Sequence, residues 1–329
     1  MPALMQRAVL ALATIVLVLT VTFTGLHLAP GDPVRLYLGP SADEAAASTM
    51  RHRLGLDRPL PVQYAEWLGR FASGDWGESI SQHRPVTGVL RDALGPTLLL
   101  TGSSLLLTYL LGIAIGVVQA ARERSALDTA LTVITTGLQS IPSYVLGLGL
   151  VLVFAYFAVL WNWPPMIRLP ALGSSGIGAD LLRPAQQLAD RIRHLILPVT
   201  TLSLVGAAGL ARYVRTATLE ALRQPSVRTA RAKGLGETRV LVRHALRGAL
   251  LPVITLAGLQ LPALFSGVVF VETIFAWPGM GRVAVQAVLA RDYPVVMAAT
   301  AVFAALVVLG NLLADAAVAI ADPRVSNAS

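Results

Sequence analysis

The strongest constraint on the fold is a series of long apolar stretches whose central parts carry no charged residue. The first, Ala8–Leu28, has about 21 residues. At a rise of ~1.5 Å per residue, a helix of this length crosses the ~30 Å hydrocarbon core of a bilayer. A signal peptide is the alternative, because Arg7 precedes the stretch, but the apolar part of a signal peptide has only about 7–15 residues. We therefore expect a membrane anchor.

The composition excludes a soluble globular domain. Hydrophobic residues make up 55% of the 329 residues and charged residues only 13%, against the ~25% charged content typical of soluble domains. So few charged residues cannot cover a soluble protein of this size. We expect an all-α integral membrane protein with about six transmembrane helices. The expected spans are Ala8–Leu28, Pro96–Ala121, Leu127–Leu160, Leu195–Ala211, Leu250–Val271 and Pro294–Ile320.

The charge distribution predicts the orientation. The formal net charge is +8, and the loop Arg212–Gly248 carries nine basic residues against two acidic ones. Basic residues concentrated between two spans indicate a cytoplasmic loop, and no aromatic residues alternate with them as on many nucleic-acid surfaces. Residues 29–95 carry seven arginines and eight acids, which suits the outer face. Both termini are then cytoplasmic. The expected parts are an anchor at 1–28, an extracytoplasmic region at 29–95, a five-helix core at 96–320 with the cytoplasmic loop 212–249, and a tail at 321–329.

The sequence lacks the residues that several functional classes require. No span carries Asp, Glu, Lys or Arg at its midplane, which disfavours a proton-coupled symporter. The five histidines are scattered and cysteine is absent, so we expect no metal site. The single lysine, Lys233, is followed by Gly234, whereas a nucleotide-binding P-loop needs Ser or Thr there. We expect no catalytic residues, and any ATPase that drives this protein is a separate chain.

The basic loop has the local pattern of two short helices joined by a turn. Ser226 is a candidate N-cap, Val227–Lys233 spans two turns, and Gly234 supplies a left-handed stop. We expect the second helix over Glu237–Ala249. We expect Val227 and Ala230 to be exposed among basic residues and to enter a groove of a cytoplasmic partner. The alternative is a loop that only fixes membrane orientation.

The same loop resembles the "EAA" cytoplasmic motif of ABC importer permeases, in the form found in the dipeptide/oligopeptide/nickel subfamily. The matching residues are Arg228–Leu235, His244–Arg247 and Leu250–Pro252, with Arg228-Thr229-Ala230 where many importers have Glu-Ala-Ala. Further resemblances follow in the family's order, and the long first outer region is similar to that of the "B" permease. They are Pro30–Pro33, Leu54–Pro59, Gly74–Gly77, Ser140–Tyr144, Glu272–Gly281, Arg291–Pro294 and Asp322–Arg324.

This resemblance implies a type I ABC importer permease in the bacterial plasma membrane. Its implied partners are a second homologous permease, two ATPase subunits that bind ATP and Mg²⁺, and an extracytoplasmic substrate-binding protein. The implied ATPase-coupling residues are Val227, Arg228, Thr229, Ala230, Arg231, Ala232, Lys233 and Gly234.

Two further groups of residues are candidates for substrate and partner contacts. The polar residues at membrane depth are candidates for the translocation path, with hydrogen bonding between helices as the alternative. They are Gln139, Ser140, Tyr144 and Gln260. The charged residues of the last outer loop are candidates for docking the binding protein, with solvated loop charges as the alternative. They are Glu272, Arg282, Arg291 and Asp292.

The expected cargo is short peptides. Nickel, glutathione and oligosaccharides remain open, because the binding protein largely sets specificity in such systems. A facilitator that needs no ATPase is the alternative from another class. An integral membrane enzyme is disfavoured, because it would show clustered ionisable residues near an interface.

Overall fold

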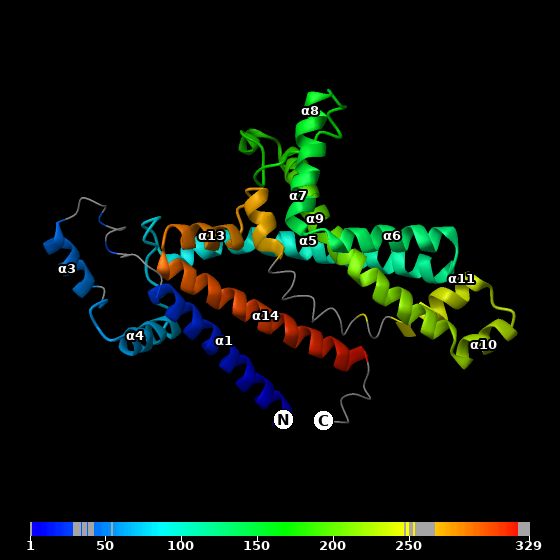
Figure 1. Ribbon diagram of the computed structural model, residues 1–329, viewed down its shortest axis with the longest axis horizontal. Helices are drawn as coiled ribbons and strands as arrows, with labels where there is room; N and C mark the ends of the chain where they lie inside the picture. The colour runs from blue at the N-terminus through cyan, green and yellow to red at the C-terminus, as the bar shows by residue number, and fades with distance from the viewer. Residues whose placement is uncertain are drawn as a thin grey trace. The chain divides into compact units, whose positions relative to one another are not determined.

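The computed structural model describes residues 2–28, 34, 38, 43–53, 55–246, 248–249, 253 and 267–321 (Figure 1). These residues are almost entirely helical, and the β-structure among them is one isolated bridge between Glu78 and Pro85. The helices are α1 (Pro2–Leu28), α3 (Glu44–Arg53), α4 (Leu60–Ala72), α5 (Val86–Ala121), α6 (Ala126–Ser140), α7 (Ser143–Val151), α8 (Ala158–Leu160), α9 (Pro184–Leu222), α10 (Pro225–Ala232), α11 (Glu237–Val240), α13 (Met280–Leu289) and α14 (Tyr293–Ala321).

Five helical segments among the described residues are long and apolar enough to cross a membrane. They are Val9–Leu28, Val86–Ala121, Ser143–Leu160, Pro184–Leu222 and Tyr293–Leu313. An all-α membrane fold is therefore confirmed. The expected span Leu250–Val271 lies outside the described residues except for Val253 and 267–271.

The third expected span, Leu127–Leu160, is not one continuous helix. α6 ends at Ser140, and α7 begins at Ser143 and continues through a π-helical turn, Leu152–Phe157, into α8. Ile141 (φ −87°, ψ 123°) and Pro142 (φ −56°, ψ 138°) are extended. A proline disfavours helical backbone in the residue before it, which explains the position of the break.

The fourth expected span was too short. α9 runs for 39 residues from Pro184 to Leu222, so it extends beyond the expected span Leu195–Ala211 at both ends. Arg191, Arg193, Arg212 and Arg215 lie on this helix rather than in flanking loops. The expected ends followed the apolar run alone, whereas the helix continues through charged residues on both sides of that run.

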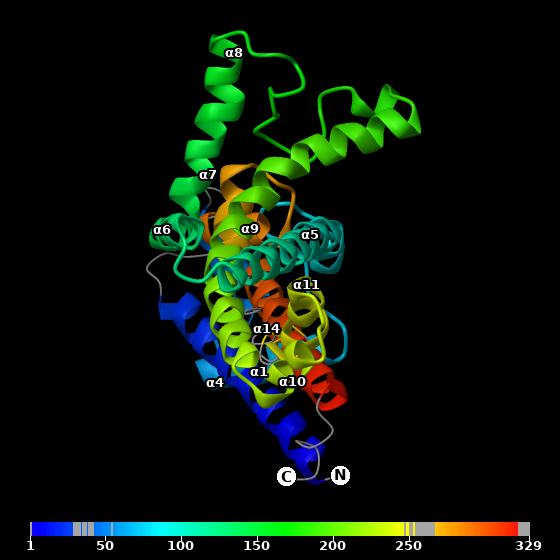
Figure 2. The same ribbon diagram turned by 90° about the vertical axis from the view of Figure 1, so that its right-hand side faces the viewer.

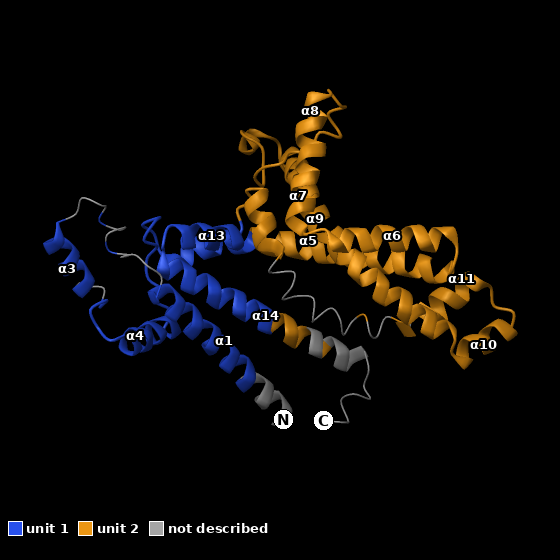
Figure 3. Cartoon of the chain, in the orientation of Figure 1, with its two compact units in different colours: residues 1–95, 279–308 blue, residues 96–278, 309–329 orange. Residues whose placement is uncertain are grey.

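The chain divides into two compact units, coloured separately in Figure 3. Unit 1 consists of residues 1–95 and 279–308. In its core the first turns of α5 pack against α13 and α14, as between Val89, Met280 and Val296. A second cluster joins α1 and α14 through Phe23 and Met297.

Unit 2 consists of residues 96–278 and 309–329. Its core includes a very close approach of α5 and α9. A Cβ added at Gly112 would lie 2.8 Å from Leu210, and one at Gly116 would lie 2.6 Å from the Ala211 carbonyl oxygen. These glycines, four residues apart, form the small-residue spacing that allows membrane helices to pack backbone to backbone. α6 also packs along α9, and α10 follows the last turn of α9 (Figure 2).

Candidate functional site

Helix α10 (Pro225–Ala232) begins two residues earlier than the candidate N-cap Ser226 implies. Gln224 is the residue before the helix, Pro225 occupies the first helical position, and no side chain caps the helix. The expectation that Ser226 is the N-cap was therefore wrong. Proline suits the first position because its missing N–H would have no partner there anyway. Gly234 adopts φ +76°, so the expected left-handed stop is confirmed.

One face of α10 is buried within unit 2. Val227 and Ala230 are only 1% and 4% exposed, and they pack against Val240 with Leu222 and Leu235 at the edges. The expectation that Val227 and Ala230 are exposed was therefore wrong. The chain reverses at Leu235–Gly236, so α11 covers the apolar side of α10.

The opposite face of α10 is exposed and basic. Arg228, Thr229, Ala232 and Lys233 are exposed, and the structure records no ion pair of Arg228 or Lys233 with any described residue. Arg231 makes two hydrogen bonds to Glu237, from Nε at 2.9 Å and from Nη2 at 3.0 Å. We call Arg228, Thr229, Ala232 and Lys233 the basic face.

The second helix of the loop is partly regular. α11 covers Glu237–Val240 and continues as a π-helical turn, Leu241–Ala245. Val240 and Ala245 are buried, whereas His244 is exposed. This segment therefore supports α10 from one side and presents His244 on the other.

Three of the four translocation-path candidates cluster at the helix break. Gln139 and Ser140 end α6, Tyr144 lies in the first turn of α7, and all three are exposed. The Ser140 hydroxyl donates to the Thr136 carbonyl oxygen at 2.9 Å, and the Tyr144 ring lies 6.4 Å from that of Phe270. Gln260 lies outside the described residues.

The four docking candidates do not share an exposed surface. Glu272 and Asp292 are completely buried, so neither can contact a binding protein, and their proposed docking role is wrong for this structure. Thr97 donates to Glu272 at 2.6 Å, and Ser79 donates to Asp292 at 2.5 Å. Arg282 and Arg291 are half-buried.

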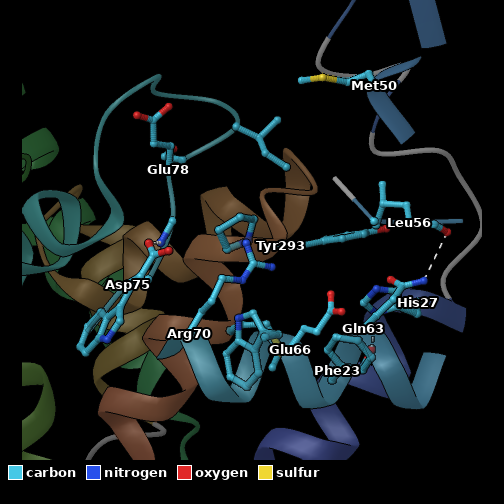
Figure 4. A pocket seen from close by; sticks show the side chains of 18 residues that line it. Phe23, His27, Met50, Leu56, Gln63, Glu66, Arg70, Asp75, Glu78 and Tyr293 are labelled. Carbon is cyan, nitrogen blue, oxygen red and sulfur yellow. Dashed lines mark hydrogen bonds between the residues drawn. The ribbon is translucent and has the colours of Figure 1, made fainter. Parts of the chain in front are cut away.

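Sequence reasoning missed a cavity of about 400 Å³ in unit 1 (Figure 4). It lies between the end of α1, helix α4 and the start of α14. Arg70 and Glu66 of α4 extend into the same space as Tyr293. The signal in the sequence was the spacing of Tyr64, Trp67 and Phe71, which places three aromatic rings on one side of α4.

Two family models match the chain. The "Binding-protein-dependent transport system inner membrane component" model matches residues 112–327, and the N-terminal model of the same kind of membrane component matches residues 1–101. The chain belongs to this family of ABC importer permeases. It is a multi-pass inner-membrane protein, as expected from the sequence.

Relatives of this permease match along almost its whole length. A putative peptide permease protein of Brucella suis biovar 1 is 39% identical over 326 residues, 98% of each chain. The oligopeptide transport system permease protein AppB of Bacillus subtilis is 40% identical over 323 residues, again 98% of each. The glutathione transport system permease protein GsiC of Salmonella typhi is 37% identical over 322 residues, 98% of this chain and 97% of the relative.

Proposed function

We propose that this permease imports di- and oligopeptides across the bacterial plasma membrane, using ATP hydrolysed by separate ATPase subunits. A second homologous permease completes the translocation path, and an extracytoplasmic binding protein delivers the peptide. The relatives named as peptide permeases support the cargo, and the family name supports the binding protein. ATP and Mg²⁺ are bound by the ATPases, so this chain transports without catalysing hydrolysis.

The observation that carries this proposal is the two-sided construction of α10. Val227 and Ala230 fix the helix to the rest of unit 2, while the basic face remains exposed. An exposed helix held by a packed apolar face can follow a partner as a rigid element. Arg228 and Lys233 suit a partner groove with acidic groups at its edge, because long basic side chains can form charge-assisted hydrogen bonds there.

The remaining coupling residues support this helix. The ion pair between Arg231 and Glu237 connects α10 to α11 across the turn. Gly234 allows that turn because its φ of +76° is strained for residues with a Cβ. Thr229 and Ala232 lie on the basic face, where small side chains let a partner approach the helix closely.

The translocation path in this proposal passes the break between α6 and α7. Gln139, Ser140 and Tyr144 present an amide and two hydroxyl groups around it, and Gln260 is assigned to the same path from the sequence. Amide and hydroxyl groups can donate and accept hydrogen bonds, so they match peptide backbones of any sequence. Of the four docking candidates, we retain Arg291 as a contact for the binding protein, because its side chain is partly exposed and makes no ion pair with any residue that the structure describes.

The test is a pull-down of the tagged, detergent-solubilised permease followed by reconstitution. We expect a second permease and one or two ATPases to co-purify, and proteoliposomes to accumulate a labelled tripeptide only with ATP and the binding protein. A permease that purifies alone and transports the peptide without ATP would instead establish a facilitator.

Glutathione is a second candidate cargo, because the glutathione permease GsiC matches the chain over nearly its full length. Competition in the same proteoliposomes separates the two. Inhibition of tripeptide uptake by unlabelled di- and tripeptides, but not by glutathione, supports the peptide assignment, whereas the reverse supports glutathione.

A further inference from the structure

An ion pair with a buried carboxylate connects α9 to the beginning of α6 within unit 2. Asp128 is 4% exposed. Arg215 donates from Nε to Oδ1 at 2.9 Å and from Nη2 to Oδ2 at 2.7 Å. Two parallel hydrogen bonds fix the direction of the pair as well as its distance. Removing Arg215, whose side chain is 29% exposed, would leave the buried carboxylate of Asp128 without compensation, so this contact resists separation.

The same carboxylate also organises the turn before α6. The backbone N–H of Arg124 donates to Asp128 Oδ2 at 3.0 Å, and the N–H of Asp128 donates to the hydroxyl of its N-cap, Ser125, at 3.2 Å. Nearby, Glu123 lies 3.9 Å from Arg223. Two arginines near the end of α9 therefore hold the connector between α5 and α6.

The pair lies between α10 and the helix break. α9 ends seven residues after Arg215, at Leu222, and Leu222 packs against the buried face of α10. From Asp128, α6 runs as one helix to Gln139 and Ser140. α6 also contacts α5 through the hydrogen bond from Gln119 to Thr132, at 3.0 Å. A displacement of α10 would therefore move the end of α9. The ion pair would pass that movement from α9 to α6.

We infer that the contact between Asp128 and Arg215 is the positioning contact through which movement of α10 reaches α6 and the break at Ile141–Pro142. Neither residue touches the cargo in this inference; both act by keeping α6 in register with α9. The inference rests on the proposed function, because it assumes that α10 is moved by an ATPase.

The experiment uses the complete importer in proteoliposomes and measures ATP hydrolysis and tripeptide uptake in the same vesicles. We expect Asp128→Asn and Arg215→Gln to lower uptake per ATP hydrolysed about fivefold or more, the lower end of typical coupling strengths. Because both changes break one contact, the double variant should be no worse than either single variant. The control is Arg212→Gln, which should leave uptake per ATP hydrolysed unchanged. Arg212 is an exposed arginine on the same helix and makes no ion pair within the described part of the chain.

A rescue experiment separates positioning from simple stabilisation. The chain has no cysteine, so Asp128→Cys with Arg215→Cys introduces a unique thiol pair on this permease. We expect poor coupling before bridging with a short bifunctional thiol reagent, and restored coupling afterwards. The parent permease treated with the same reagent controls for thiols on other chains.

Three outcomes would overturn the inference. The first is normal uptake per ATP hydrolysed in Asp128→Asn. The second is that uptake and ATP hydrolysis both fall in proportion to the amount of complex lost. The third is that coupling is not restored although mass spectrometry verifies the bridge. Failure of the unmodified importer to transport peptide would be a different result, because it would contradict the proposed function itself. If Asp128→Asn does not assemble, Arg215→Lys keeps the charge but loses the two-pronged geometry, and should lower uptake per ATP hydrolysed.

Discussion

The carboxylate of Asp292 accepts a hydrogen bond from the hydroxyl of Ser79, 213 residues earlier in the chain, at 2.5 Å. The N–H and hydroxyl of Ser81 donate to the same oxygen, at 2.9 and 2.8 Å. The other oxygen faces the N–H of Val295 at 3.4 Å, in the first turn of α14. A residue that the sequence placed among outer-loop charges is therefore a structural centre of unit 1.

Replacing Asp292 should destabilise unit 1. In Asp292→Ala, the buried hydroxyl of Ser79 and the two donors of exposed Ser81 lose their acceptor and α14 loses its cap, so we expect a cost of about 2–4 kcal/mol. The measurement is the thermal unfolding midpoint of the purified permease in detergent. Asp75→Ala is the control, because Asp75 is exposed and, among the described residues, its side chain accepts only from the N–H of Gly77. Equal midpoints for both variants would contradict the structural role.

Adding one methyl group at Gly116 should separate α5 from α9. In Gly116→Ala the new Cβ would meet the Ala211 carbonyl and Val214 at 2.6 Å, and backbone cannot yield as a flexible side chain can. We expect a lower unfolding midpoint and less assembled complex. Gly102→Ala is the matched control on the same helix, because no described residue outside its own stretch of helix has an atom within 4 Å of the added Cβ. Alanine there should be neutral or stabilise by up to about 1 kcal/mol through helix propensity.

The two faces of α10 should respond differently to charge. Arg228→Glu changes only the exposed face, so we expect normal folding but weaker retention of the ATPase in co-purification. Val227→Asp puts a charge into a site that is 1% exposed, so we expect loss of both α10 packing and ATPase retention. Limited proteolysis of the loop reports the packing. Arg239→Glu, at an exposed position of α11, controls for the change in loop charge. If it weakens retention as much as Arg228→Glu, the contact is not specific to the basic face.

Gly234→Pro should impair uptake while leaving the permease inserted in the membrane. Proline cannot adopt the φ of +76° found at Gly234, so the turn between α10 and α11 must rearrange. We expect ATP hydrolysis to continue with little uptake in proteoliposomes. Gly236→Pro is a control in the same turn, because Gly236 has a φ of −62° that proline accepts. Normal uptake by Gly234→Pro would show that this turn is not needed for coupling.

Tyr144→Ala should change transport kinetics without changing stability. Tyr144 is 47% exposed beside the helix break, so its removal leaves little buried space but takes away a polar group from the proposed path. We expect a higher KM for peptide uptake and an unchanged unfolding midpoint. Tyr156→Ala, 58% exposed in the π-helical turn after α7, is the matched control. Equal kinetics in both variants would favour a packing role for Tyr144.

The sequence predicted the features that depend on neighbouring residues. Apolar length located α1 and α14, and the left-handed turn at Gly234 followed from the glycine itself. The sequence could not predict the features that depend on partners far away along the chain. Glu272 is buried and accepts a hydrogen bond from Thr97, 175 residues away, and Val227 is buried because the chain reverses and brings Val240 over it. In each case, burial is a property of the pair and is not visible in either segment alone.

The interruption at Ile141–Pro142 also restricts what can surround it. Where a helix stops, its last carbonyl oxygens and the first N–H groups of the next helix lack partners inside the helices. Hydrocarbon offers no hydrogen bonds, and each such group left bare in it costs several kcal/mol. Lipid acyl chains therefore cannot be what surrounds the break in the permease. Water, a passing solute or a polar helix surface must solvate it instead.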